Sequence, residues 1–274
     1  MTTVTNCVIL SSLKKLLENQ LYRGGLIGES YERREISMYI PREQLESIAE
    51  KYTAAYFNMI AHESETRYPR VDPARIAGDL LHLNLYSFPL SVEGTILGCC
   101  ALDETEIELY FSDGHIEPIH LRKGDIVIDS SLEDASQEGR RNFTIAHETA
   151  HQILNREFPG SHIPLRHRRV HVLYRRRGQH DSIEWQADTL ASMLLMPRPL
   201  IYETMKQFDL NKPIEILNRA FYWDEFQKFE NMAQYLGVSK QALCIRLKQL
   251  KLVGKEYLAN PYDLVNVYVD DENM

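Results

Sequence analysis

Two histidines four residues apart, with a glutamate directly after the first, are the groups in this sequence best suited to chemistry. They form the motif His147-Glu148-Thr149-Ala150-His151 inside an apolar run at residues 143–154. Residues i and i+4 of a helix share a face, so both imidazoles can reach one metal ion. Neutral imidazole suits Zn²⁺, and a catalytic zinc site combines three protein ligands with one position open to water, for which Glu148 would be the general base. The same motif also occurs by chance, with histidines that are only surface or core residues.

A second predicted helix supplies a candidate third ligand. Glu184, Ala187 and Ala191 share one face of it, and small alanines allow two helix backbones to approach closely. Glu184 would then complete a His-His-Glu set of ligands. Asp188 would accept a hydrogen bond from the second ring nitrogen of His147 and fix its tautomer. The alternative is an ordinary helix with two exposed acidic residues.

Together these segments resemble the ImmA/IrrE family of zinc metallo-endopeptidases. The matching stretches are residues 140–151, Glu184-x-x-Ala187-Asp188 and residues 194–197, against the family pattern R-x-R-F-T-x-A-H-E-x-x-H, E-x-x-A and L-L-M-P. Asn142 replaces the second arginine and Ala150 the more usual glycine, but neither position is a ligand. The resemblance covers about residues 65 to 250 and is strongest in the two core motifs.

The resemblance implies that His147, His151 and Glu184 bind one Zn²⁺ per chain and that Glu148 is catalytic. It also implies a protein substrate, a helix-turn-helix transcriptional repressor whose cleavage relieves repression. The Glu-x-x-x-Asp arrangement is similar to thermolysin-like gluzincins, which supports the orienting role of Asp188.

Composition limits the other classes of function. The chain has 274 residues, 44% of them hydrophobic, which is enough for one large domain or two small ones. No segment is long and apolar enough for a membrane span, and no signal peptide is recognised, so we expect a cytoplasmic protein. Four cysteines without a C-x-x-C pair predict reduced, packed thiols. A net charge of −8 argues against bulk, non-specific binding of nucleic acid.

The pattern of elements predicts an α+β fold, a zincin-like core of a small sheet and the motif helix, with a helical C-terminal subdomain. We expect an N-terminal helical extension at residues 1–35, the peptidase core at 36–198 and the subdomain at 199–274. Asp72 is a predicted N-cap, and Asp113-Gly114 a predicted hairpin turn. The predicted strands are residues 95–101, 106–111, 116–121 and 125–129, with one edge strand as a candidate clamp for substrate peptide. The predicted C-terminal helices are 200–208, 214–222, 226–236 and a Ser239-capped helix to 250.

An arginine-rich connection, with six arginines in residues 166–177, separates the two motif helices. Arg175, Arg176 and Arg177 would hold an acidic substrate segment or nucleic-acid phosphate, or belong to a solvated hairpin arm. Tyr174 or His180 would be the oxyanion donor. The sequence does not choose among these alternatives.

The segment 226–250 looks like a helix-turn-helix. Its second helix would offer Lys240, Gln241, Arg246 and Lys248 to a DNA groove. This supports an alternative function, a DNA-binding or repressor-sequestering regulator without proteolysis. Its leucines and a similar segment inside the catalytic domain of the resembled family favour a structural or substrate-binding role, and the intact Glu148 counts against a pseudoenzyme.

Overall fold

The computed structural model describes residues 39–63, 65–92, 94–159, 182–210 and 212–265, with the backbone of 171–172. The chain divides into two compact units, Met1–Ile36 and Ser37–Met274. The first unit lies outside the described residues. So does most of the arginine-rich connection, including Tyr174, Arg175, Arg176, Arg177 and His180.

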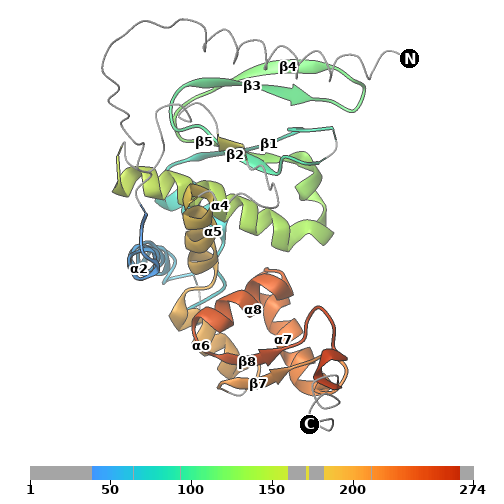
Figure 1. The fold of residues 1–274 in the computed structure, drawn as a ribbon. Coiled ribbons are helices and arrows are strands. Elements are labelled where there is room, and N and C mark those ends of the chain that lie inside the picture. Colours follow the sequence, from blue (N-terminus) through green and yellow to red (C-terminus); the bar gives the residue numbers. More distant parts are fainter. Residues whose placement is uncertain are drawn as a thin grey trace, which may run out of the picture. The chain divides into compact units, whose positions relative to one another are not determined.

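A four-stranded mixed sheet lies beside the motif helix (Figure 1). Its order is β1-β5-β2-β6, with bounds Asn84–Phe88, Asp125–Asp129, Gly98–Cys100 and His171–Val172. Strand β1 runs parallel to β5, whereas β2 is antiparallel to both of its neighbours. All five residues of β5 are buried, as expected for an inner strand. Strand β1 was not predicted, because its short sequence Asn-Leu-Tyr-Ser-Phe alternates only weakly.

A separate hairpin packs over part of this sheet. It pairs β3 (Thr105–Tyr110) with β4 (Ile116–Leu121) in antiparallel register. The predicted turn is confirmed, because the Asp113 side chain accepts a hydrogen bond from the amide of His115 and Gly114 has a φ of 86°. Leu109 and Leu121 of the hairpin are buried in a small apolar cluster with Val127 of β5.

Three long helices carry the rest of the predicted core. These are α2 (Arg42–Met59), α4 (Glu138–Glu157) and α5 (Ser182–Leu195), with the short α3 (Pro73–Arg75) between α2 and α4 in the chain. Asp72 caps α3 as predicted, with its side chain 2.9 Å from the amide of Ala74. Helix α5 packs against both α2 and α4, and Figure 1 shows α5 crossing α4 on the side away from the sheet. The α+β class is therefore confirmed, with the motif helix between the sheet and the other helices.

The C-terminal region mixes helices and strands. It contains α6 (Arg198–Gln207), β7 (Ile214–Leu217), α7 (Trp223–Leu236), α8 (Lys240–Gln249) and β8 (Val253–Glu256). The predicted helix at 214–222 is wrong: β7 pairs in parallel with β8, and Asn218 then accepts hydrogen bonds from the amides of Ala220 and Phe221, which forms a turn. The pairing depends on a glycine, because a Cβ at Gly254 would lie 2.7 Å from the carbonyl oxygen of Glu215.

One continuous apolar cluster joins α2, α4 and α5 to α6, α7 and α8. The predicted thiol packing holds for Cys99, Cys100 and Cys244, which are free and buried. Within the described ranges, no helix has both the length and the apolar character that crossing a membrane requires.

Candidate metal centre

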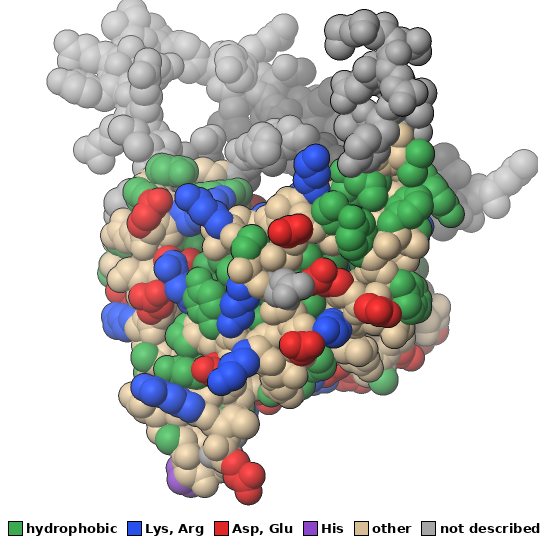
Figure 2. Space-filling view, turned by 90° about the horizontal axis from the view of Figure 1, so that it is seen from below, with side chains coloured by type: hydrophobic (Ala, Val, Ile, Leu, Met, Phe, Trp, Pro, Cys, Tyr) green, Lys and Arg blue, Asp and Glu red, His purple; other side chains and the backbone are tan. Residues whose placement is uncertain are grey.

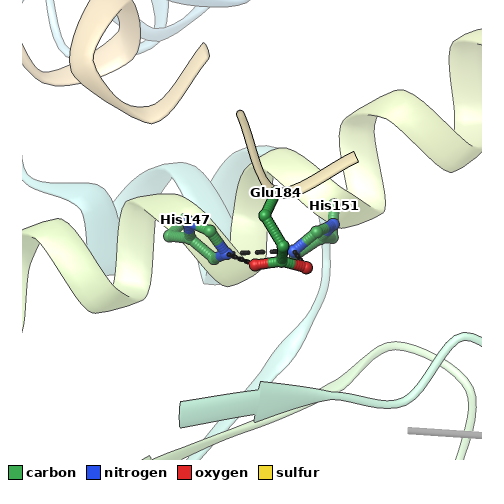
Figure 3. Close-up of side chains that lie close together, drawn as sticks. All are labelled: His147, His151 and Glu184. Carbon is green, nitrogen blue, oxygen red and sulfur yellow. Dashed lines mark hydrogen bonds and ion pairs between the residues drawn. The ribbon is translucent and has the colours of Figure 1, made fainter. Parts of the chain in front are cut away.

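Three side chains from α4 and α5 converge on one point (Figure 3). The Nε2 atoms of His147 and His151 are 3.0 Å apart. The carboxylate of Glu184 lies 3.2 Å from the first of these nitrogens and 3.4 Å from the second. Ligand atoms about 2.1 Å from a tetrahedral zinc ion are about 3.4 Å from one another. The three residues therefore fit a zinc-sized cation both in donor type and in spacing.

Close packing of two helices creates this convergence. Ala146 and Ala150 on α4, and Ala187 and Ala191 on α5, are all buried in the same apolar cluster. Their small side chains let the two backbones approach, so a carboxylate of α5 can reach two imidazoles that leave α4 one turn apart. The close approach of the two helices, which the spacing of Ala187 and Ala191 predicted, is therefore confirmed.

The carboxylate of Asp188 lies 2.9 Å from Nδ1 of His147. Because an ionised carboxylate only accepts hydrogen bonds, Nδ1 is the donor. Nε2 faces the cluster and is the nitrogen that could bind a metal ion, which would displace its proton. Burial opposes a positive charge on His147, but its hydrogen bonds with Asp188 and Glu184 outweigh burial and raise its pKa to about 10. The cluster therefore carries an excess of negative charge that attracts a cation.

Glu148 is fully buried beside this cluster. Burial raises the pKa of Glu148 to about 8, against the opposing charge of His147. Neither of its carboxylate oxygens has a partner at hydrogen-bond geometry, although the thiol of Cys100, a weak donor, lies close enough to lower the pKa of Glu148. A buried carboxylate without partners is costly for folding, so its presence points to a role in chemistry rather than in stability.

One residue that shapes this site, Gly98, was not predicted from sequence. Gly98 of β2 lies against α4, where an added Cβ would be 2.7 Å from Cγ2 of Thr144 and 3.2 Å from Oε1 of Glu148. Only glycine lets the strand backbone come this close to the carboxylate. A glycine within a short predicted strand was the available signal.

The predicted peptide clamp stays a prediction. Strands β2 and β5 lie inside the mixed sheet, whose described edges are β1 and the two residues of β6. Of the strands expected from sequence, only β3 and β4 have a free edge, since they form a sheet of two strands.

The interpretation that Arg246 faces a DNA groove is wrong. Its side chain is fully buried, and its guanidinium bonds both oxygens of Glu46 on α2, at 2.9 and 2.6 Å. Its Nε donates to the carbonyl oxygen of Met196, at 2.9 Å. Lys240 and Lys248 of the same helix are exposed, but each forms an ion pair, with Glu230 and Glu256 respectively. Sequence could not show this, because both Glu46 and Met196 are distant along the chain.

Comparison with known families gives one match. A family model described as Peptidase_M78, the IrrE N-terminal-like domain, matches residues 105–248, more than half of the chain. The matched stretch begins at β3 and ends within α8, so it includes α4, α5 and most of the helix-turn-helix-like segment. No curated protein matches the chain.

Proposed function

We propose a function from the premise that the chain belongs to the Peptidase_M78 family of IrrE N-terminal-like domains. Membership in this family supports peptidase activity, and His147, His151 and Glu184 form a group that could hold a metal ion. Our specific proposal is a zinc-dependent endopeptidase that cleaves a protein. The proposed substrate is a helix-turn-helix transcriptional repressor, whose cleavage would relieve repression.

The observation that carries the proposal is the contrast between the cluster and its neighbour. The cluster brings two imidazole nitrogens and the carboxylate of Glu184 within 3.0–3.4 Å of one another, with a different carboxylate oxygen facing each histidine, and these separations are close to those between ligands of zinc. Directly after His147 in the chain comes a buried carboxylate whose oxygens have no hydrogen-bond partner. Three ligands beside a general base are the parts that metal-assisted hydrolysis needs.

Each residue then has a defined task. When bound, zinc supplies Lewis acidity, which lowers the pKa of water and polarises a peptide carbonyl. His147, His151 and Glu184 would hold it, and Asp188 would fix the ring of His147. Glu148 would accept a proton from the attacking water and pass it to the leaving amine. Glu148 therefore gains one proton and loses one proton in each turnover.

The experiment compares wild type with Glu148→Gln. The probe is a purified helix-turn-helix repressor from the same genome. It is incubated with each zinc-loaded protein, and any fragments are identified by mass. We expect fragments with wild type and a decrease in rate of about 10² to 10⁴ with the variant, because the amide cannot take up the proton. Zinc content should be unchanged in the variant, because Glu148 is not one of the proposed ligands.

Two results would contradict the proposal. If zinc-loaded wild type produced no fragments from the repressor or from an unfolded protein such as casein, peptidase function would be wrong. If Glu148→Gln cleaved as fast as wild type, the chemistry would belong to another group. Release of an operator without any fragments would instead indicate a regulator that sequesters the repressor.

A further inference from the structure

A cavity of about 820 Å³ opens beside the metal centre. His147 and Asp188 line it, so the cavity reaches the proposed site of chemistry. Its other walls come from the first turns of α4, from α5, from the segment 94–97 and from α8. A cavity of this size lies within the range of sites that enclose a ligand rather than a single water.

Helix α8 is held rigidly as one of these walls. Arg246 joins it to α2 and to the end of α5 through Glu46 and the Met196 carbonyl. The turn before α8 is fixed to α4, because Asn142 donates a hydrogen bond of 2.9 Å to the carbonyl oxygen of Gly237. At Gly139 the backbones approach so closely that an added Cβ would lie 3.2 Å from the amide nitrogen of Ser239. The position of α8 relative to the metal centre is therefore preorganised.

Each face of α8 has a separate environment. Leu243, Cys244 and Leu247 are buried in the core. Lys240 and Lys248 project outward and form ion pairs with acidic residues. Acidic and basic side chains are mixed over the surface seen from below, with no continuous basic patch in that view (Figure 2). The face formed by Gln241, Ala242, Ile245 and Gln249 lines the cavity.

Large apolar groups line this cavity, and one of them is unusually exposed. Phe143 and Trp185 are partly buried, while Ile245 is 46% exposed although it lies on a helix with a core face. One ring face of Trp185 stacks on Tyr39, with ring centroids 5.7 Å apart. These three side chains would gain burial if a large apolar group entered the cavity.

Two buried polar atoms on the cavity walls have no hydrogen-bond partner. They are Oγ of Ser192 on α5 and Oε1 of Gln249 on α8. Ser192 is only 7% exposed, and its hydroxyl does not bond the carbonyl one turn earlier, as helical serines often do. Buried polar groups in native proteins nearly always have a hydrogen-bond partner. Two such groups without partners, in residues that line one cavity, point to a ligand with hydrogen-bonding groups of its own.

We propose that this cavity is a specificity groove that binds a segment of the protein substrate, and that α8 forms the wall that selects its side chains. A large apolar side chain of that segment packs between Phe143, Trp185 and Ile245, and neighbouring main-chain groups bond Ser192 and Gln249. This inference rests on the proposed peptidase function, which requires a peptide at the metal centre. The charged side chains Arg140 and Asp188 on the lining have opposite signs, so the cavity has no cluster of cations for a phosphate backbone. Its apolar groups and uncharged hydrogen-bonding groups suit a peptide with apolar side chains better.

Binding can be measured without cleavage, because the chain has only two tryptophans, Trp185 and Trp223. Replacing the exposed Trp223 by Phe leaves Trp185 as the only reporter, and Glu148→Gln suppresses hydrolysis. The probes are synthetic decapeptides that differ at one central position, which is Phe in one and Asp in the other. We expect the Phe peptide to change Trp185 emission and to bind roughly tenfold more tightly or better, since a full aromatic side chain leaves water.

Variants on two faces of α8 test the wall directly. Ile245→Asp should remove the preference for the Phe peptide, whereas Lys248→Ala, on the outward face, should keep it. Ser192→Ala should weaken both peptides equally by a few fold, because it removes a main-chain contact. Circular dichroism and zinc content should match wild type in all three, since Ile245 and Lys248 are exposed and Ser→Ala creates no large cavity.

The outcomes separate this inference from the proposed function. Equal binding of both peptides, no binding of either, or an unchanged preference in Ile245→Asp overturns the groove, even if wild type cleaves protein with zinc. Selective binding by the protein with Trp223→Phe and Glu148→Gln, together with no cleavage of protein by zinc-loaded wild type, supports the groove and overturns the peptidase proposal. Retention of duplex DNA that Lys248→Ala abolishes, with no peptide preference, overturns the groove in favour of a DNA-binding helix.

Discussion

Helices α4 and α8 both carry polar groups into the protein interior, but the two sets differ in their hydrogen bonding. On α8, the buried guanidinium of Arg246 has all three of its described contacts within 2.9 Å, to Glu46 and to a main-chain carbonyl. On α4, Glu148 is equally buried, but neither carboxylate oxygen has a hydrogen-bond partner. The first arrangement is complete within the chain, whereas in the proposed function the second would be completed by a metal ion and substrate.

This difference separates structure from function among buried charges. A buried charge that is fully paired holds elements together, and its loss should be felt in stability. A buried ionisable group without hydrogen-bond partners costs stability, and under the proposed function its loss should be felt in chemistry. Substitutions at the two groups should therefore differ in effect, with a loss of stability around Arg246 and a loss of metal binding or chemistry around Glu148.

The largest expected effect on folding comes from Glu46→Gln. This change leaves Arg246 buried without its counter-charge, which typically costs about 3–5 kcal/mol. The free energy of unfolding, from urea denaturation at pH 7, should decrease by that amount. Glu50→Gln on the exposed side of the same helix α2 is the matched control and should change it by less than about 0.5 kcal/mol.

The pH dependence of the stability lost in Glu46→Gln shows whether the loss comes from charge or from packing. Burial alone would raise the pKa of Glu46, but the hydrogen bond and charge of Arg246 outweigh burial and lower its pKa below the ordinary value of 4.5. The pair therefore stabilises the fold fully above that value and progressively less as the pH falls through the lower folded pKa. The difference between wild type and Glu46→Gln should shrink below about pH 4.5. A constant difference down to pH 3 would show that packing, not charge, is lost.

A smaller effect, and one without a large loss of stability, is expected from Asp188→Asn. The amide can still contact Nδ1 of His147 but cannot supply the negative charge, and such outer partners typically contribute 10- to 100-fold to metal affinity. Competition titration with a zinc chelator should show a weakening in this range, while the urea midpoint stays near that of wild type. Unchanged zinc affinity would mean that the contact of 2.9 Å only orients the ring.

The two helices also differ in how far their roles could be predicted from sequence. The geometry at α4 follows from local spacing: the histidines are four positions apart, and Ala187 and Ala191 mark the face of α5 that packs. The environment of Arg246 depends on Glu46, 200 positions away, which no local pattern reveals. The same limit explains why β7 and β8 were missed, because each of these short strands is defined by a partner distant in the sequence.

The groove of α8 shows a second limit. Gln249 and Ser192 are ordinary helical residues in the sequence, and only the arrangement of α5 and α8 makes both of them line one cavity with a polar atom unpaired. The Asp72 cap and the Asp113-Gly114 turn were predictable because a few neighbouring residues determine each of them.

The central claim, that His147, His151 and Glu184 hold the metal of a peptidase, is tested most directly by zinc stoichiometry. Elemental analysis should find about one Zn²⁺ per chain in wild type, as expected for a single site with three protein ligands. The same stoichiometry is expected in Glu148→Gln, and a marked loss in Glu184→Ala with its circular dichroism unchanged. Full zinc occupancy in Glu184→Ala, or none in wild type purified and dialysed with zinc, would contradict this assignment.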